Sequence, residues 1–522
     1  MRVSTSLICD LLGAVVFTGA FTLSSLRWLR VLQREHYEAA ALRRFWWRWS
    51  SPAVGAATAR LRSSSRPFTL THLSLLAVLI GIVLDNHALL LLATAVYGCL
   101  CPVGLSLKGR TSRLVWTRRL RTTAATFGVL SAALVALSLA IGAGWWGGLV
   151  VVWGNILLLE LSTRLLAPYE ARQSNVFVQR AKRRLDAVHP LVVGITGSYG
   201  KTSTKHHLAD LLARDGGVVA TPRSFNNRAG LSRAINEGLV DGTRVFIAEM
   251  GTYGPGEIAD LCSWCAPTLS IITAIGPVHL ERMGDLDTIE RAKFEITGPA
   301  STVIVNVDDA RLRHWPARLT GKRVRTAGSV EAADVTVRVV DDAWSISVDG
   351  APVGSIAPLP SVQPTNLACA IAAALELGLH LDDVVARSGQ VAPVANRANV
   401  VTAPSGVVVI DDTFNANPAS AAASVALLQR QDVSGRRVVV TPGLIELGPD
   451  QFRENAALAA SVRAMGAELV IVQRTNVRAL RDGFGGDVRR FDTRDGAVAW
   501  VRSSLTAGDA VLYLNDLPDH YP

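Results

Sequence analysis

The sequence predicts an α-helical membrane region followed by two α/β domains: a doubly wound central domain with a phosphate-binding loop, and a Rossmann-like C-terminal domain. Three observations predict this fold class. Long apolar runs fill the N-terminal third of the 522 residues. After them, short apolar strands alternate with segments of helical spacing, the pattern of a parallel sheet covered by helices. A glycine-rich turn and a Lys-Thr pair lie between the first such strand and helix.

The composition points to a membrane rather than to nucleic acid. Hydrophobic residues make up 49% of the chain, and the mean hydropathy of +0.28 is high for a purely soluble protein. Lys and Arg number 53 against 43 Asp and Glu. Much of the arginine lies before residue 186 and borders the apolar runs. We therefore expect a membrane-surface role for the positive charge.

Five apolar segments are each expected to cross a bilayer, which takes ~20 helical residues. In order they are Leu7–Leu26, Leu70–Leu84, Ala88–Leu105, Ala124–Ile141 and Gly148–Leu161. The first could also be read as a cleaved signal peptide. Only Arg2 precedes it, however, and an arginine-rich segment follows it, so we expect a retained anchor.

The loops between these segments predict their orientation. The loops after the first and third segments are rich in arginine, and the other two are short and lack Lys and Arg. The positive-inside rule then puts the N-terminus outside and everything after Leu166 in the cytoplasm, where ATP is. We expect an integral protein of the cytoplasmic membrane, with a membrane region over 1–170 and a basic connector over 171–190.

The central domain is expected over 191–395. Its predicted strands are Val192–Thr196, Arg244–Met250, Leu269–Ile275 and Thr302–Val307, and its predicted helices are Thr202–Ala213, Pro255–Trp264 and Asp287–Ile296. Residues 334–357 read as a small antiparallel insert, and a helix is expected at Thr365–Leu377.

A hinge around Val391–Arg397 leads into the C-terminal domain, expected over 396–522. The same alternation predicts strands at Val407–Asp411, Arg437–Val440, Leu469–Val472 and Ala510–Leu514, with helices at Ala419–Gln429 and Gln451–Met465.

The glycine-rich turn Gly194–Thr202 has the layout of a phosphate-binding loop, or P-loop. Glycines let the backbone fold around an anion, and the following helix N-terminus adds partial positive charge. Lys201 would reach the terminal phosphates, and the Thr202 hydroxyl would hold magnesium. Ile195 stands where the usual motif has its first glycine.

Three further polar residues draw attention. Glu249 and His279 follow apolar strands, and in open α/β sheets ligands bind at that edge. Taken singly, a strand-end Glu, a lone His and the helical Lys293 are as readily solvated or structural residues. Cys262 and Cys265 form a lone C-x-x-C without nearby His ligands, which favours two half-buried helical thiols over zinc or redox chemistry.

Together these residues resemble the Mur ligase family, the ATP-dependent amide ligases of peptidoglycan synthesis. The matching stretches are Gly194–Thr204, Ser224–Asn227, Ala248–Gly251, Pro255–Ile258, Ile275–Glu281, Ala292–Ile296 and Asn306–Asp309. Asp411–Pro418 and Gly443–Gly448 are most similar to the branch that adds D-alanyl-D-alanine. The resemblance covers Leu191 to Leu514.

The resemblance implies roles for individual residues. The residues that would hold the ATP phosphates are Gly197, Ser198, Tyr199, Gly200, Lys201 and Thr202. Thr202 and Glu249 would bind one magnesium ion, and His279 and a carbamylated Lys293 a second. Asn306, Arg397 and Asp412 resemble residues that enclose the nucleotide. Lys201, His279 and Lys293 are the expected catalytic residues.

The implied reaction joins a carboxylate to an amine through an acyl phosphate, with ATP and Mg²⁺ as cofactors. The family's soluble UDP-sugar-binding domain is absent, and the apolar segments stand in its place. Val362 replaces a frequent His, and Asn515–Pro522 departs from the branch's C-terminal segment. The acceptor, cell-wall type or lipid-linked, and the amino acid or dipeptide added therefore stay open.

Two other classes compete with a ligase: an ATP-driven membrane transporter, and a membrane scaffold with a decayed nucleotide fold. The sequence lacks a transporter signature such as L-S-G-G-Q, and its apolar segments contain few charges besides Asp10 and Glu160. The intact Lys201, Glu249 and Lys293 argue against decay.

Overall fold

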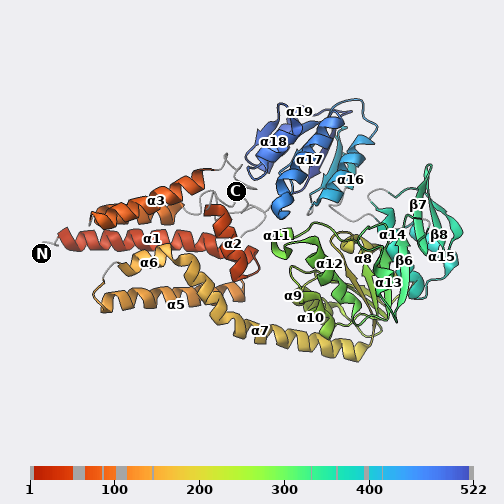
Figure 1. The fold of residues 1–522 in the computed structure, drawn as a ribbon, viewed down its shortest axis with the longest axis horizontal. Coiled ribbons are helices and arrows are strands. Elements are labelled where there is room, and N and C mark those ends of the chain that lie inside the picture. The colour runs from red at the N-terminus through yellow and green to blue at the C-terminus, as the bar shows by residue number, and fades with distance from the viewer. Residues whose placement is uncertain are drawn as a thin grey trace.

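The computed structural model describes residues 5–50, 65–84, 87–100, 114–143, 146–330, 332–359, 362–392, 399–413 and 416–516. These residues form an N-terminal helical region, a central α/β domain and a C-terminal α/β domain. Figure 1 shows the helical region on one side and the two α/β domains stacked on the other. The predicted sequence of fold classes along the chain is therefore found in the structure.

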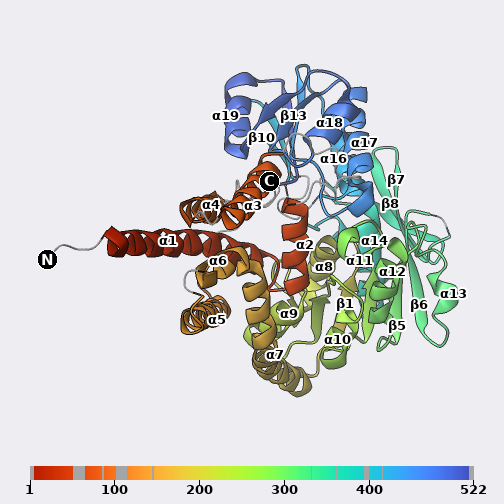
Figure 2. The same ribbon diagram turned by 60° about the vertical axis from the view of Figure 1, so that its left-hand side comes forward.

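The helical region consists of α1 to α6 and the first part of α7. Their bounds are Thr5–Arg34, Ala39–Ser50, Ser65–Val83, His87–Leu100, Arg118–Ala140, Trp146–Trp153 and Asn155–Val188. Trp28, Leu32, Leu42, Leu120 and Leu159 form its buried core. Figures 1 and 2 both place α2 between the other helices of this region and the α/β domains.

Two described helices are long and apolar enough to cross a membrane. They comprise Ala14–Arg34 of α1 and Arg118–Ala140 of α5, and α6 with α7 would give a third if the bent pair is one span. The apolar parts of α3 and α4 that the structure describes, Leu73–Val83 and Leu89–Gly98, are shorter. Among the described residues, two or three helices thus have the length and apolarity of a span, compared with the five predicted spans.

The predicted fifth span is not a single straight helix. The chain bends by 71° between α6 and α7, at Gly154, whose low helix propensity allows the break. The residues of the predicted basic connector lie in the second half of α7, which continues without interruption from Asn155 to Val188. One helix therefore links the helical region to the central domain.

The central domain contains one sheet in the order β2-β3-β1-β4-β5-β6-β7-β8-β9. Pairing is parallel from β2 to β7 and antiparallel between β7, β8 and β9. The strands span Leu191–Thr196, Val218–Ala220, Val245–Glu249, Leu269–Ile272, Thr302–Asn306, Arg323–Gly328, Val335–Val340, Ala343–Val348 and Ala351–Ile356 for β1 to β9. The predicted antiparallel insert is confirmed as β7 to β9.

Helices cover both faces of this sheet, as the prediction of a doubly wound domain requires. On one face, the end of α7 packs with α9 (Arg228–Gly238), α10 (Glu257–Trp264) and α12 (Leu286–Phe294) over a shared core. On the other face lie α8 (Lys201–Leu212), α14 (Pro364–Glu376) and α15 (Leu381–Ser388). The predicted helices correspond to α8, α10, α12 and α14, and α9 and α15 were not predicted.

The C-terminal domain has a second sheet in the order β10-β11-β15-β12-β13-β14, parallel except for β10. These strands are Asn399–Thr402, Val408–Asp412, Arg437–Thr441, Glu468–Val472, Arg489–Phe491 and Ala510–Leu514 for β10 to β15. Its helices are α16 (Pro418–Gln429), α17 (Gln451–Ala464), α18 (Val477–Phe484) and α19 (Arg494–Ser504). The parallel, Rossmann-like core was predicted, whereas β10, β14, α18 and α19 were not.

Candidate active site

The P-loop connects β1 to α8 at the carboxyl edge of the central sheet. Gly197 and Gly200 have φ values of 151° and 79°, in the region that favours glycine. A Cβ at Gly200 would lie 2.4 Å from Oδ1 of Asn366. Residues other than glycine rarely adopt the positive φ of Gly200, which lets the loop turn tightly into α8, beginning at Lys201. The backbone geometry is that of an anion cradle at a helix N-terminus.

The loop opens into a cavity of about 580 Å³, within the usual range of ligand pockets. It lies between the helical region, the central domain and the C-terminal domain. The predicted site residues that line it are Gly197, Ser198, Tyr199, Gly200, Lys201, Thr202, Glu249, His279 and Lys293. The sequence prediction thus brought together nine residues from four separate segments that do share one cavity.

Glu249 ends β3, which is paired with β1, so its carboxylate lies beside the P-loop. Its Oε2 accepts hydrogen bonds from Oγ1 of Thr202 at 3.0 Å and from Nζ of Lys205 at 3.1 Å. Burial acts to raise the pKa of Glu249, but the charges of Lys205 and Lys201 outweigh it and hold this pKa below its usual value. The carboxylate is therefore ionised and suited to binding a hard cation.

Lys201 and Lys293 present two amino groups to the cavity. Nζ of Lys201 donates to the carbonyl of Gly197 at 2.6 Å and lies over its own loop. Lys293 is 3% exposed. Burial, and secondly the charge of Lys201, hold the pKa of Lys293 well below its usual value, which favours the uncharged amine over the ammonium.

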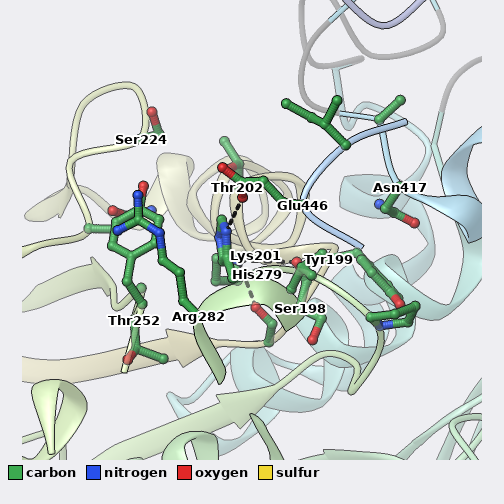
Figure 3. A pocket seen from close by; sticks show the side chains of 18 of the residues that line it. Ser198, Tyr199, Lys201, Thr202, Ser224, Thr252, His279, Arg282, Asn417 and Glu446 are labelled. Carbon is green, nitrogen blue, oxygen red and sulfur yellow. Dashed lines mark hydrogen bonds and ion pairs between the residues drawn. The ribbon is translucent and has the colours of Figure 1, made fainter. Parts of the chain in front are cut away.

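His279 faces the C-terminal domain across the cavity. Its Nδ1 lies 2.5 Å from Oε2 of Glu446, which belongs to the loop after β12. Both residues have left-handed backbones, with φ of 54° and 62°, a conformation that costs free energy and is frequent at functional sites. Figure 3 shows the two side chains facing each other beside Lys201 and Thr202.

The three predicted nucleotide-enclosing residues are placed differently. Asn306 is buried, donates to the carbonyl of Thr273 at 2.7 Å and does not line the cavity. Asp412 is also buried outside the cavity lining and accepts from Oγ of Ser424 at 2.7 Å. Arg397 lies outside the described residues. Their roles remain predictions.

Several cavity residues were not predicted as site residues. They are Arg34, Glu35, His36, Ser224, Asn226, Asn227, Thr252, Tyr253, Arg282, Asn417, Glu446 and Asn515, among others. Ser224, Asn226, Asn417 and Glu446 stand in stretches that carried the family resemblance, which was the available signal. Nothing in the local sequence marked the residues of the helical region.

The described residues contain no cluster of three or more His, Cys, Asp or Glu side chains suited to a metal ion. Magnesium bound here would therefore need other oxygens besides that of Glu249, and the hydroxyl of Thr202 is positioned to supply one. Cys262 and Cys265 are buried free thiols away from the cavity. They are the buried thiols that the sequence favoured.

A P-loop, an ionised carboxylate and a buried lysine in a cavity between domains are typical of an enzyme that uses ATP. Comparison with known families agrees. The Mur ligase middle domain matches residues 195–374, and the Mur ligase glutamate ligase domain matches residues 396–514.

Individual relatives extend this match. The UDP-N-acetylmuramoyl-tripeptide–D-alanyl-D-alanine ligase of Mycobacterium tuberculosis (strain ATCC 25618 / H37Rv) is 31% identical over 359 residues, which cover 62% of this chain and 69% of that protein. The enzyme of the same name from Synechocystis sp. is 31% identical over 330 residues, which cover 62% of this chain and 71% of that protein. The chain belongs to the Mur ligase family.

Solved structures agree on the fold. MurF from Acinetobacter baumannii gives a TM-score of 0.57 at 24% identity, covering 66% of this chain and 77% of that chain. MurF ligase from Thermotoga maritima in complex with ADP gives a TM-score of 0.58 at 23% sequence identity. The match covers 66% of this chain and 80% of that chain. Mur ligases use ATP and Mg²⁺ to form amide bonds, and the chain is accordingly an ATP-dependent acid–amino-acid ligase. The transporter and scaffold alternatives are set aside.

Proposed function

We propose that the chain adds an amino acid or a dipeptide to the carboxylate of a cell-wall precursor, held either on a nucleotide or at a membrane. The observation that carries this proposal is the shared cavity of Lys201, Glu249, His279 and Lys293, which the C-terminal domain closes with Glu446. The curated relatives named above act on UDP-N-acetylmuramoyl-tripeptide and D-alanyl-D-alanine, which are the first candidate substrates.

The proposed roles follow the contacts. The loop Gly197–Thr202 and the ammonium of Lys201 hold the ATP phosphates. Thr202 and Glu249 would hold one Mg²⁺, and the hydrogen bond between their side-chain oxygens, at 3.0 Å, supports this assignment. His279 and Lys293 bind a second. These ions neutralise charge on the phosphoryl oxygens when bound.

Carbamylation of Lys293 fits its environment. A neutral amine is the form that attacks CO₂, and the pKa of Lys293 is held low by burial. The product is an anion with two oxygens, whose negative charge next to Lys201 attracts the Lys201 ammonium. An arginine would stay cationic in this place.

The reaction has two steps in this proposal. A carboxylate oxygen of the acceptor attacks the γ-phosphorus of ATP, the bond to the β-phosphate oxygen breaks, and ADP leaves. The amine nitrogen then attacks the acyl carbon, phosphate leaves, and the nitrogen loses a proton. Lys201 neutralises charge on the transferred phosphoryl group, and the enclosure by two domains excludes water from the acyl phosphate. Asn306, Asp412 and Arg397 are assigned to the nucleotide side.

The helical region is proposed to be a membrane anchor over 1–170, followed by 171–190 as connector and by the two ligase domains over 191–395 and 396–522. The length and apolarity of α1 and α5 support it, as do many apolar side chains on their outer surfaces, such as Val129, Leu137 and Leu139. The N-terminus would be outside, the ligase domains cytoplasmic, and membrane lipid a partner.

The test is ADP release by the full-length protein in detergent, with UDP-N-acetylmuramoyl-tripeptide or a lipid-linked form of the same peptide as acceptor. D-alanyl-D-alanine or a mixture of amino acids supplies the amine, and mass spectrometry identifies the product. ADP should require both acceptor and amine, and Lys201→Ala should abolish its release while the exposed Lys182→Ala leaves it unchanged. ATP hydrolysis that is indifferent to the amine would overturn the proposal.

A further inference from the structure

The turn between α1 and α2 forms one wall of the catalytic cavity. Helix α1 ends at Arg34, and Arg34, Glu35 and His36 line the same cavity as Lys201. The candidate membrane span of α1 also ends at Arg34. The helical region is therefore not merely attached to the enzyme but contributes side chains to its active site.

This turn is built rigidly. Gln33 makes two hydrogen bonds with the backbone of Val115, at 2.6 Å and 2.9 Å. The hydroxyl of Tyr37 lies 3.3 Å from that of Thr117. His36 and Tyr37 both have left-handed backbones, with φ of 56° and 65°. Two consecutive non-glycine residues in this region persist only where the surroundings hold them.

Arg282 of the central domain holds the turn against the cavity. Its guanidinium pairs with Glu35 at 3.0 Å and with Glu38 at 3.3 Å, and the side chain of Arg282 is 13% exposed. The same guanidinium lies 4.8 Å from the ring centre of Tyr253. Arg282 is thus a planar bridge between two carboxylates of the helical region and an aromatic ring of the central domain.

Aromatic contacts continue from this bridge to the reaction centre. The ring centre of Tyr253 lies 5.6 Å from that of His36 and 4.6 Å from that of His279. His279 in turn contacts Glu446. A continuous series of contacts therefore runs from the helical region through the central domain to the C-terminal domain.

One cation of this wall, Arg34, is placed to bind an anion. Arg282 is neutralised by Glu35 and Glu38, and within the described residues Arg34 has no carboxylate at ion-pair distance. Arg34 is exposed and faces the cavity. A guanidinium matches the paired oxygens of a phosphate. The carboxylate that reacts must lie near the phosphates held at Lys201, so we assign an anion at Arg34 to another part of the acceptor.

We propose that the α1–α2 turn is the acceptor subsite, where Arg34 binds the phosphate that links the acceptor to its carrier and Arg282 is the positioning residue that holds the turn. The inference rests on the proposed function and specifies its substrate as a phosphorylated carboxylate acceptor. The carrier is either a nucleotide or a lipid, and the end of the α1 span beside the subsite makes both accessible to it.

The test compares three acceptors that carry the same tripeptide: UDP-linked in solution, linked through a diphosphate to a lipid in nanodiscs, and a muramoyl tripeptide without phosphate. The wild-type full-length protein should show a KM for the phosphate-free acceptor at least tenfold above that for the better phosphorylated one, the scale of one charged hydrogen bond. Arg34→Gln should lose this discrimination, with unchanged KM for ATP. Comparison of the KM values for the UDP-linked and the lipid-linked acceptor identifies the carrier that the enzyme uses.

Arg282→Lys keeps the charge but loses the planar bridge, and it should raise the acceptor KM while ATP binding, measured directly, is retained. Arg172→Gln, which removes an exposed arginine of α7 outside the cavity, should behave as wild type. Equal discrimination by wild type and Arg34→Gln would overturn this inference alone. Absence of product with all three acceptors would instead overturn the proposed function on which it rests.

Discussion

The ammonium of Lys205 lies 3.1 Å from Oε2 of Glu249, and both side chains are removed from solvent, at 0% and 1% exposure. Lys205 is one helical turn beyond Lys201 and also donates to the backbone carbonyl of Arg223. The pair therefore fixes the carboxylate beside Thr202 and gives Glu249 its direct ion-pair partner.

Lys205→Met should destabilise the protein by about 3 kcal/mol or more, because it leaves a buried carboxylate unpaired. The measurement is the shift of the unfolding transition of the central domain in urea. Lys182→Met removes an exposed helical ion pair with Asp186 and should change stability by less than about 0.5 kcal/mol. Equal changes in the free energy of unfolding for the two variants would show that the buried ion pair stabilises the protein no more than the exposed one.

Glu446→Gln should lower kcat roughly tenfold, because it weakens a charged contact to His279 that joins the central and C-terminal domains. Direct binding of ATP should be retained, since the substitution leaves the P-loop backbone and Lys201 unchanged. Steady-state kinetics with saturating substrates make the measurement. Glu468→Gln, at a surface pair with Arg436 in the same domain, is the matched control, and a kcat that follows the control would contradict the prediction.

A carbamate on Lys293 should give a carbonyl resonance in ¹³C NMR after incubation with ¹³C-labelled bicarbonate. Lys293→Arg should lack this resonance and have no ligase activity, because arginine stays charged and forms no carbamate under these conditions. The retained binding of ATP would show that the variant is folded. A wild-type spectrum without the resonance, together with an active arginine variant, would rule the modification out.

His207 predicts a pH dependence of stability. It is 1% exposed, and burial, with a smaller effect of His206, lowers the pKa of His207 from 6.5 to about 4. Between these values the unfolded chain binds the proton and the folded one does not, so stability is full above pH 6.5 and falls as pH decreases towards 4. The loss should reach roughly 3 kcal/mol.

His207→Leu removes this titration and should flatten the corresponding part of the curve. The measurement is the difference between the wild-type and variant unfolding midpoints from pH 7.5 to pH 4.5, in which contributions from other groups cancel. A constant difference over this range would show that His207 is not the group responsible.

Cys262 should resist alkylation in the folded protein. Burial, and secondly the charge of Glu295, raise the pKa of Cys262 to about 12, so at pH 8 its thiolate fraction is about 1,000-fold below that of a thiol at 9.0. Peptide-level mass spectrometry after iodoacetamide treatment should find it labelled only after unfolding in urea. Rapid labelling of the folded protein would mean that the thiol is accessible and reactive.

The sequence was sufficient to predict the strands and the loop at the carboxyl edge of the central sheet. Apolar β-branched runs define β1 and β3 locally, and the parallel pairing of Ile195 with Glu249 follows from the fold class. The glycines of the P-loop are needed for local backbone reasons, so their role is visible in the sequence. His279 was predicted for the same reason, because it follows a strand that ends at this edge.

The sequence was not sufficient to predict contacts that depend on how the helical region, the central domain and the C-terminal domain pack together. In the sequence, Arg282 is only a charged residue after the stretch Ile275–Glu281, and Glu35 is only a residue after an apolar run. Their ion pair depends on the direction of α7 and on the bend at Gly154, which are properties of tertiary packing. Short edge elements such as β10 and β14 were missed because few residues cannot establish a period.

Helix α7 sets the geometry of the whole assembly. Its 34 residues correspond to a rod of about 50 Å, with one end in the helical region and the other packed on the central domain. Each residue added to this rod would rotate one end against the other by about 100° and swing Glu35 away from Arg282. Only insertions or deletions of about a whole helical turn would therefore keep the helical region and the central domain in the same relative orientation.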